Sequence, residues 1–346
     1  MGEGNSFDGD KVSSGDNNLL PAGYELDDYV IVKELGSGTF GVTYLARDKA
    51  LDEPEAIKEY FPLKCSKRRY ADMHIVPKDD DSHIDFEKGL IGFENEAKVL
   101  TRLRNEPNIV KILRLFRRNG TCYFVMPFIA SRELKSVIRE ENEIPTPFVE
   151  NMLLKLLDGL EKLHDINFLH RDIKPANILI ANETHEPILI DFGAARQALG
   201  DEADEEMSVI LTEVFAAPEQ HDAREKLGPS IDIFGLAGVA YNCVTGAAPP
   251  KPATRGVRDP YQPLEPQASN EQERRLFAAI DWGLKLDPLL RPQTIAEWRN
   301  GIVNGVLPNA AGGRAAGDDD GTLLMPSGGR VPADGSDASI SVARPA

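Results

Sequence analysis

Alternating apolar and polar residues near the start of the chain predict a group of antiparallel strands. Alternating and β-branched residues fill positions 29–32 and again 42–46, and the glycine-rich stretch 35–41 separates the two runs. A third apolar segment, Glu55–Lys58, ends at a lysine, and two more, 107–110 and 123–126, are predicted as the last strands of the group. The glycine-rich stretch therefore lies at the turn of a predicted hairpin.

Apolar residues at helical spacing dominate the chain from position 90 onward. They recur through 90–103 and form a leucine stripe through 148–164, which predicts two helices with one buried face each. Residues 230–241 are apolar nearly all round, which predicts a helix buried on every side. The order of elements is thus strands first and helices afterwards.

The two ends of the chain differ from this middle part. Residues 1–23 are polar, acidic and glycine-containing, and 308–346 are rich in Ala, Gly, Asp, Ser and Pro. Such compositions bury too little apolar surface to offset the entropy of ordering, so we expect a disordered leader and a disordered tail around a domain at 24–307. Within the tail, 322–325 is the one apolar stretch and a weak candidate for a docking motif.

Charge and cysteine content narrow the classes of partner and compartment. The formal net charge of −17 argues against nucleic acid and anionic membranes as partners, because both select for excess Lys and Arg. Protein partners with basic segments fit better. Cys65, Cys122 and Cys243 make neither a paired nor a metal-ligand pattern, which favours reduced thiols in the cytoplasm. No apolar run approaches the ~20 residues of a membrane helix.

The stretch His170–Asn177 carries the clearest chemistry. Asp172 is followed five positions later by Asn177, so a carboxylate able to accept a hydroxyl proton lies beside an amide able to bind a divalent ion. Asp191 follows the apolar run 188–190, which predicts a short buried strand, and Gly193 comes shortly after it. A carboxylate at that position suits Mg²⁺ bound to a nucleotide, which prefers hard oxygen ligands.

Together these residues closely resemble the catalytic and metal-binding loops of eukaryotic-type Ser/Thr protein kinases, including bacterial members of that family. The resemblance covers about 29–305. It implies an α+β, bilobal protein-kinase fold. A small lobe, 24–128, would hold an antiparallel sheet and one regulatory helix, and a larger, mainly helical lobe would follow at 129–307.

The resemblance also implies an ATP site. Lys58 would contact the α- and β-phosphates and pair with Glu96, for which Glu94 is the rival. Thr43 stands where the family has valine, and Pro127 has no N–H, so Ile129 would hydrogen-bond the adenine. The implied nucleotide-binding residues are Leu35, Gly36, Gly38, Gly41, Thr43, Ala56, Lys58, Glu96, Met126, Ile129, Leu179 and Asp191. Taken alone, the glycine stretch is also compatible with a flexible turn, and Lys58 with a surface lysine.

Residues 62–85 exceed what the simplest members of the family need between Lys58 and Glu96. A basic cluster, 64–69, is followed by an acidic one, 78–81. This pattern is typical of a solvated loop that neutralises its own charge. Because the segment precedes the regulatory helix, a control element is the alternative.

On the phosphoacceptor side, Lys174 lies two positions after Asp172 and in this family indicates Ser/Thr specificity. Thr212 matches the threonine that bridges Asp172 and Lys174 in such kinases. Ser208 lies where an activating phosphate is often found, and Arg171 would receive it. Glu205 or Glu206 could occupy the Arg171 site instead. Asp232, and Arg291 paired with Glu219, match structural residues of the family.

These observations predict a Ser/Thr protein kinase that uses ATP with Mg²⁺, or with Mn²⁺ as the alternative metal. It would act on protein substrates and autophosphorylate its activation segment, which contains Ser208 and Thr212. Asp172 would accept the proton, and Asn177 and Asp191 would bind the metal. A pseudokinase scaffold and a small-molecule kinase are the alternatives. The second lacks a segment like 217–219, and the first usually loses one of the catalytic residues, all of which are present here.

Overall fold

The computed structural model describes residues 18–38, 40–192, 213–221, 227–255 and 259–308. The chain divides into two units, 1–307 and 308–346. Ser208, Thr212, Glu205 and Glu206 lie outside the described residues, as does nearly all of the predicted tail.

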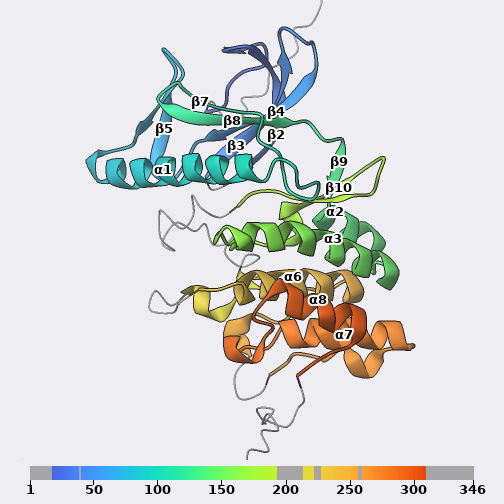
Figure 1. Ribbon diagram of the computed structural model, residues 1–346. Helices are drawn as coiled ribbons and strands as arrows, with labels where there is room; N and C mark the ends of the chain where they lie inside the picture. The colour runs from blue at the N-terminus through green and yellow to red at the C-terminus, as the bar shows by residue number, and fades with distance from the viewer. Residues whose placement is uncertain (1–17, 39, 193–212, 222–226, 256–258, 309–346) are drawn as a thin grey trace, which may run out of the picture. The chain divides into compact units, whose positions relative to one another are not determined.

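A six-stranded antiparallel sheet is built from the first part of the chain (Figure 1). Its strand order is β1-β2-β3-β4-β8-β7. The strands are β1 (Glu25–Leu26), β2 (Tyr29–Gly38), β3 (Gly41–Asp48), β4 (Pro54–Tyr60), β7 (Arg114–Arg118) and β8 (Thr121–Pro127). The hairpin β2–β3 carries the glycine-rich stretch at its turn, as predicted. A Cβ on Gly41 would lie 2.1 Å from the carbonyl oxygen of Glu59, so this position admits only glycine.

The prediction of a strand at 107–110 is wrong. This segment makes only an isolated parallel bridge, Ile109 to Leu189, and the strands of the sheet that follow are β7 and β8. Ile109 is buried against α3 (Thr146–Asp165), where Gly159 leaves room for it: a Cβ there would lie 3.0 Å from the Ile109 side chain. Ile109 and Val110 are therefore buried by packing between elements and not by a place in the sheet.

Helix α1 (Asp80–Arg102) lies along one face of the sheet and begins ten positions earlier than the apolar spacing predicts. Asp79 caps it by accepting a hydrogen bond from the backbone N–H of Ser82, and two acidic residues in the first turn favour the positive end of the helix dipole. On its buried side, Phe93 stacks on Phe124 of β8 with ring centroids 4.7 Å apart. This contact holds the middle of the helix against the sheet.

The expectation of a solvated loop at 62–85 is also wrong. The segment contains a hairpin, β5 (Ser66–Arg69) and β6 (His74–Pro77), and leads directly into α1. Ser66, Arg68 and Ile75 are buried. The Arg68 guanidinium pairs with the carboxylate of Glu59 in β4, and neither side chain is exposed to solvent. Arg68, which the charge pattern predicts to be exposed, is therefore buried and links the hairpin to β4.

The folded part of the small lobe begins earlier than residue 24. Leu20 is only 4% exposed and its N–H donates to the hydroxyl of Tyr44 at 3.3 Å. The carbonyl of Asn18 accepts a hydrogen bond from Nε of Arg68 at 2.6 Å. Residues 18–23 thus pack on the sheet together with the β5–β6 hairpin, which corrects the predicted boundary of the leader.

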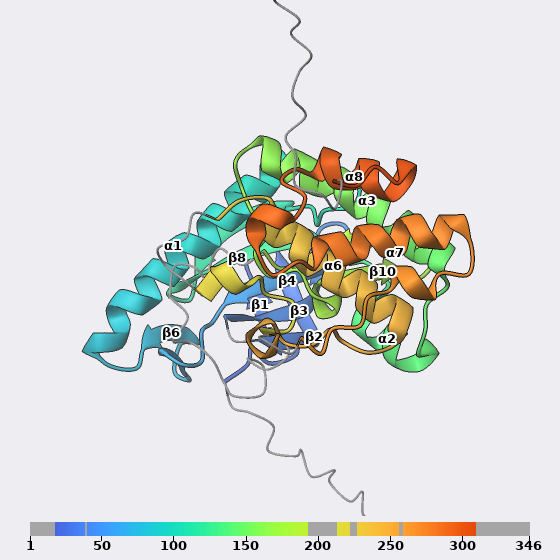
Figure 2. The same cartoon turned by 90° about the horizontal axis from the view of Figure 1, so that it is seen from below.

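The rest of the chain is mainly helical. Its helices are α2 (Leu134–Glu141), α3, α6 (Ser230–Thr245), α7 (Glu271–Gly283) and α8 (Ile295–Asn304). A small antiparallel sheet in the order β11-β10-β9 joins β9 (Ser131–Glu133), β10 (Ile178–Ala181) and β11 (Pro187–Leu189). Helix α6 packs on α3 and α7, and α7 packs on α8 (Figure 2).

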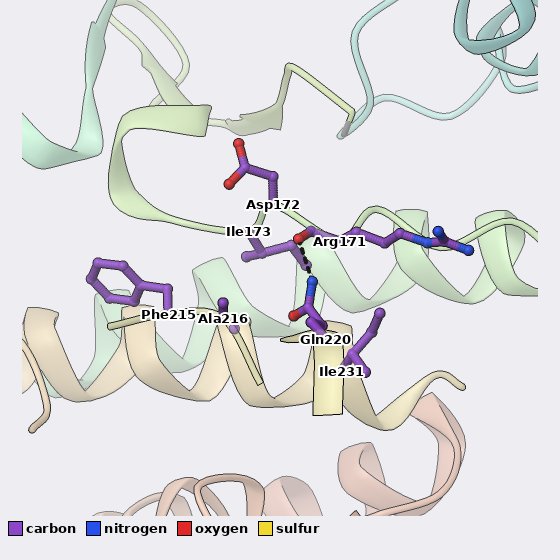
Figure 3. Close-up of a pocket in the computed structure, with 8 residues that line it drawn as sticks. Arg171, Asp172, Ile173, Phe215, Ala216, Gln220 and Ile231 are labelled. Carbon is purple, nitrogen blue, oxygen red and sulfur yellow. Dashed lines mark hydrogen bonds between the residues drawn. The ribbon is translucent and has the colours of Figure 1, made fainter. Parts of the chain in front are cut away.

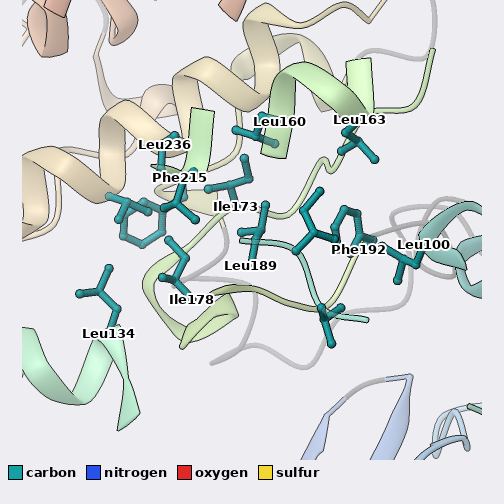
Figure 4. Close-up of a cluster of buried hydrophobic side chains, with 14 of the residues drawn as sticks. Leu100, Leu134, Leu160, Leu163, Ile173, Ile178, Leu189, Phe192, Phe215 and Leu236 are labelled. Carbon is teal, nitrogen blue, oxygen red and sulfur yellow. The ribbon is translucent and has the colours of Figure 1, made fainter. Parts of the chain in front are cut away.

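The core of this region surrounds α6 and the segment after α3 (Figure 4). Ile173, Ile178, Leu189 and Phe192 lie together there with leucines of α3 and α6. Both tryptophans of the chain are buried in this region: Trp298 Nε1 donates to the Ala279 carbonyl and Trp282 Nε1 to the Leu290 carbonyl. The segment His170–Asn177, called the catalytic segment below for its predicted role, therefore rests on a well-packed core.

Candidate functional site

One face of the six-stranded sheet carries several of the residues predicted to bind the nucleotide. In the β3–β4 pair, Thr43 lies opposite Lys58 and Leu45 opposite Ala56, and in the β4–β8 pair Ala56 lies opposite Met126. Directly opposed residues of antiparallel strands point to the same face. Thr43, Ala56, Lys58 and Met126 thus share one surface next to the glycine-rich hairpin.

Lys58 joins this surface to the segment after β11. Its Nζ lies 2.6 Å from Oδ1 of Asp191 and 3.8 Å from Oε1 of Glu96. Burial alone would lower the pKa of Lys58, but the two carboxylates outweigh burial and raise it. Burial alone would raise the pKa of Asp191, but the ion pair with Lys58 holds it below its ordinary value. Both groups are therefore charged at neutral pH.

Glu96 is the carboxylate of α1 that faces Lys58. Glu94, the rival, pairs instead with Arg117 on the outside of the sheet. Glu96 is 1% exposed, and its Oε1 has no hydrogen-bond partner within the described part of the chain. Burial raises the pKa of Glu96 to about 7, although the charge of Lys58 opposes the shift. In this structure Lys58 is bound more closely to Asp191 than to Glu96.

The catalytic segment brings Asp172, Lys174 and Asn177 together. Lys174 Nζ lies 2.9 Å from Asp172 Oδ2, and Asn177 Nδ2 donates to the same oxygen at 2.9 Å and to the Asp172 carbonyl at 2.8 Å. The short 3₁₀ turn Pro175–Asn177, which leads into β10, fixes Asn177 relative to Asp172. The carboxylate of Asp172 is thereby oriented by two side chains of its own segment.

The backbone before Asp172 is held in an unusual conformation. Arg171 has φ 68° and Asp191 has φ 56°, values that L-residues adopt at a cost of about 1 kcal/mol or more. The carboxylate of Asp232 in α6 accepts hydrogen bonds from the N–H groups of His170 and Arg171, at 2.9 and 2.8 Å. It also pairs with Nε2 of His164, a partner that the sequence did not suggest. Asp232 thus has the structural role predicted for it.

His170 is neutral and couples the two loops. Its Nδ1 accepts from the N–H of Asp172, which leaves Nε2 to donate to the Ile190 carbonyl at 3.2 Å. Burial lowers the pKa of His170 despite the nearby carboxylates, which agrees with this tautomer. The ring also packs on Phe192, with centroids 4.4 Å apart. Asp172 and Asp191 are therefore connected through one buried imidazole.

A divalent metal fits the oxygen donors of this site. The amide nitrogen of Asn177 is taken up by Asp172, so its Oδ1 is the atom left for a cation, and Asp191 offers a carboxylate that is 44% exposed. Among the described residues, no group of three or more His, Cys, Asp and Glu side chains could hold a metal. Two oxygen ligands from the chain are what Mg²⁺ requires when nucleotide phosphates and water supply the rest.

The other predicted residues flank this centre. Leu35, Gly36 and Gly38 are exposed on β2, and Leu179 lies in β10, opposite Glu133 of β9. Ile129 is half-buried after β8, and its carbonyl accepts from the Ser131 hydroxyl. No helix in the described part of the chain is long and apolar enough to cross a membrane.

A separate small recess, with a volume of about 10 Å³, lies beside the catalytic segment (Figure 3). The Asp172 side chain points away from it. Its lining residues are Arg171, Asp172, Ile173, Phe215, Ala216, Gln220, Ile231 and Gly235. Glu219, the neighbour of Gln220 in sequence, forms the predicted pair with Arg291 through two parallel hydrogen bonds of 2.8 and 2.7 Å. Gln220 is a member of this region that the sequence analysis missed.

Comparison with known proteins gives a consistent result. The family model described as "Protein kinase domain" matches residues 29–294. Serine/threonine-protein kinase D of Synechocystis is 33% identical over 217 residues, which is 61% of this chain and 40% of the relative. PknK of Mycobacterium tuberculosis is 28% identical over 286 residues, or 81% of this chain and 23% of the relative. The chain thus spans well under half the length of these curated relatives.

A solved structure described as the apo form of PpkA-294 superposes with a TM-score of 0.73 at 33% identity. The match covers 82% of this chain and 99% of that one. A match of this extent includes residues from both the sheet and the helical part.

Proposed function

Because the chain belongs to the protein kinase family, we propose that it is a Ser/Thr protein kinase, which transfers the γ-phosphoryl group of ATP to serine or threonine hydroxyls of proteins. One observation carries this proposal. Lys58, Asp172, Asn177 and Asp191 come from three separate segments, and all four take part in hydrogen bonds or ion pairs of 2.6–2.9 Å at one site. The full set of side chains that phosphoryl transfer needs is present.

Asp172 is the proposed proton acceptor. Its carboxylate orients the incoming hydroxyl and takes its proton, while Lys174 at 2.9 Å adds a positive charge beside the transferred group. Lys58 holds the α- and β-phosphates, with Glu96 as its partner in α1. Asn177 and Asp191 hold the divalent metal, which we propose is Mg²⁺ with Mn²⁺ as a substitute. The bound metal neutralises charge on the phosphates.

The adenine is proposed to bind between Leu35, Thr43 and Ala56 on one side and Leu179 on the other. Met126 lies at the back, and the N–H of Ile129 donates to the base. Gly36, Gly38 and Gly41 let the hairpin backbone approach the phosphates. Thr43 adds a hydroxyl where the family has a valine methyl group.

Regulation is proposed to act through the activation segment, with phosphate on Ser208 or Thr212 and Arg171 as the receiving cation. Burial lowers the pKa of Arg171, and the Asp232 carboxylate opposes the shift. A phosphate dianion would stabilise this half-buried cation through charge-assisted hydrogen bonds.

The acidic balance of the chain supports protein substrates with basic segments, and three free cysteines support a reducing compartment such as the cytoplasm. Substrate preference is tested with matched acidic and basic peptides. Equal rates on both would remove the charge argument.

The main test is incubation of the purified protein with Mg-ATP and a generic protein substrate, followed by intact-mass analysis and peptide mapping. Asp172→Asn and Lys58→Met are each expected to lower the rate by at least about 100-fold, because they remove the proton acceptor or a phosphate ligand. Asp158→Asn and Lys162→Met, which change two exposed residues of α3, serve as matched controls. ATP that stabilises the wild-type fold without any turnover would point to a pseudokinase instead.

A further inference from the structure

Both backbone polar groups of Arg171 are hydrogen-bonded to side chains, and one of these side chains, Gln220, has no assigned role. The N–H of Arg171 donates to Asp232 Oδ1 at 2.8 Å, and its carbonyl accepts from Nε2 of Gln220 at 2.8 Å (Figure 3). With φ at 68°, this residue is in a conformation that L-residues avoid, and it directly precedes Asp172. An unfavourable conformation persists only where surrounding contacts determine it.

Gln220 is itself fixed by contacts within the described segment 213–221. Its Oε1 accepts from the backbone N–H of Ala217 at 2.9 Å, so both ends of the amide are used. It lies in the 3₁₀ turn Pro218–His221, and its neighbour Glu219 is clamped by the buried Arg291. The chain of contacts therefore runs from Arg291 through Glu219 and Gln220 to the carbonyl of Arg171.

The surroundings leave this region little freedom. A Cβ on Gly235 of α6 would lie 3.1 Å from both the Cβ and the carbonyl oxygen of Ile173, and 3.4 Å from the Phe215 carbonyl. At Gly235, helix α6 thus packs closely against both the catalytic segment and the 213–221 segment. The side chain of Gln220 lines the small recess beside this contact.

We infer that Gln220 is a positioning residue for Asp172: its amide joins the segment 213–221 to the strained backbone of Arg171, which orients the catalytic carboxylate. The inference rests on the proposed kinase activity and deepens it. It makes the geometry of Asp172 depend on the order of the 213–221 segment, by a bond that the Arg291–Glu219 pair holds in place.

Two substitutions separate the two hydrogen bonds. Gln220→Met keeps the size and removes both bonds. Gln220→Glu, ionised at pH 8, still accepts from the Ala217 N–H but cannot donate to the Arg171 carbonyl. Gln267→Met is the matched control, because Gln267 also donates to a backbone carbonyl, that of Pro263, far from the site in sequence and on an exposed 3₁₀ turn.

Both Gln220 variants are expected to lower kcat by about 3- to 30-fold, the range that one or two side-chain hydrogen bonds account for. The KM for ATP should stay unchanged, since Lys58, Asp191 and the hinge are not altered. Gln267→Met should keep the wild-type kcat. Wild-type kcat in Gln220→Glu would overturn the inference, because the Ala217 bond alone would then suffice.

Amide hydrogen exchange gives a readout that does not need turnover. In both Gln220 variants, the peptide covering 166–177 should exchange faster than in wild type, while α7 should not change. Unchanged exchange in that peptide would contradict the inference even if the protein proved to be no kinase. Faster exchange with an inactive wild type would keep the inference as a statement about structure and reject the proposed function.

Discussion

Two of the buried arginines, Arg291 in the large lobe and Arg68 in the small lobe, bind their carboxylate partners in different ways. Arg291 grips Glu219 with two parallel hydrogen bonds, and its remaining N–H groups donate to the carbonyls of Lys285, Leu286 and Ser230. Arg68 shares Glu59 with the hydroxyls of Tyr44 and Tyr123. Each guanidinium also lies over a phenylalanine ring, at 4.9 and 4.8 Å.

The difference lies in what each carboxylate would lose. Glu219 has no hydrogen bond to another side chain in the described residues, whereas Glu59 would keep two phenolic donors without its arginine. Burial and the Glu59 charge raise the pKa of both tyrosines, which keeps these donors protonated. The large-lobe pair is thus a brace between two residues, and the small-lobe cluster is a shared network that ties the inserted hairpin and residues 18–20 to β4.

Arg291→Met should have the largest effect. It leaves the Glu219 carboxylate buried without a partner, so we expect the free energy of unfolding to fall by about 3–5 kcal/mol. Urea denaturation followed by circular dichroism measures this. Activity should fall as well, since Glu219 precedes Gln220. If the free energy of unfolding fell less in Arg291→Met than in Arg68→Met, the Arg291–Glu219 pair would not be the more sensitive of the two.

Arg68→Met should cost less, about 2–4 kcal/mol, because the tyrosine hydroxyls still satisfy Glu59. Adding Glu59→Gln should recover part of that loss, since the double variant buries no charge. The same two measurements on Arg291→Met with Glu219→Gln complete the comparison. No recovery in the small-lobe pair would mean that Arg68 acts mainly through its backbone contacts at Asn18 and Met73.

Glu96→Gln tests a buried carboxylate with a poorly placed partner. Its pKa is about 7 in the folded protein against an ordinary 4.5, so the folded state holds the proton more tightly and the stability of the wild type falls as pH rises through this range. Relative to wild type, Glu96→Gln should gain about 1–3 kcal/mol between pH 5.5 and pH 8, measured by urea denaturation without nucleotide. A pH-independent difference would show that Glu96 is ionised throughout.

The smallest effect is expected for an exposed pair. Arg47 and Asp52 lie 3.1 Å apart with side chains 53% and 82% exposed. Arg47→Ala should change the free energy of unfolding by less than about 0.5 kcal/mol, and salt should reduce the difference further. A loss near that of Arg68→Met would mean that burial does not set the ranking.

The same comparison explains what the sequence could and could not predict. The Arg291–Glu219 pair was predictable because both residues stand within family motifs at a recognisable spacing. Arg68 is one of four basic residues within 64–69, and this charge pattern is typical of a solvent-exposed loop. Its partner Glu59 directly follows Lys58, and nothing in the sequence indicates that Glu59 is buried. Only the fold reveals that one of those basic residues turns inward.

The site follows the same division. Lys58, Asp172, Asn177 and Asp191 were predicted, and the structure brings them together. Gln220 could not be predicted, because an amide that bonds two backbone groups leaves no pattern of charge or apolar spacing in the sequence. The apolar segment 107–110 was assigned to the sheet because periodicity does not distinguish a strand from a short buried connection.

Both tryptophans lie in the large lobe, Trp282 in α7 and Trp298 in α8, so tryptophan fluorescence reports on that lobe only. Intrinsic indole emission follows the environment of the large lobe alone, and the small lobe, with its sheet and inserted hairpin, contributes none. Comparing emission with the far-ultraviolet signal in one denaturation series would therefore show whether the two lobes melt as a single cooperative unit or one after the other.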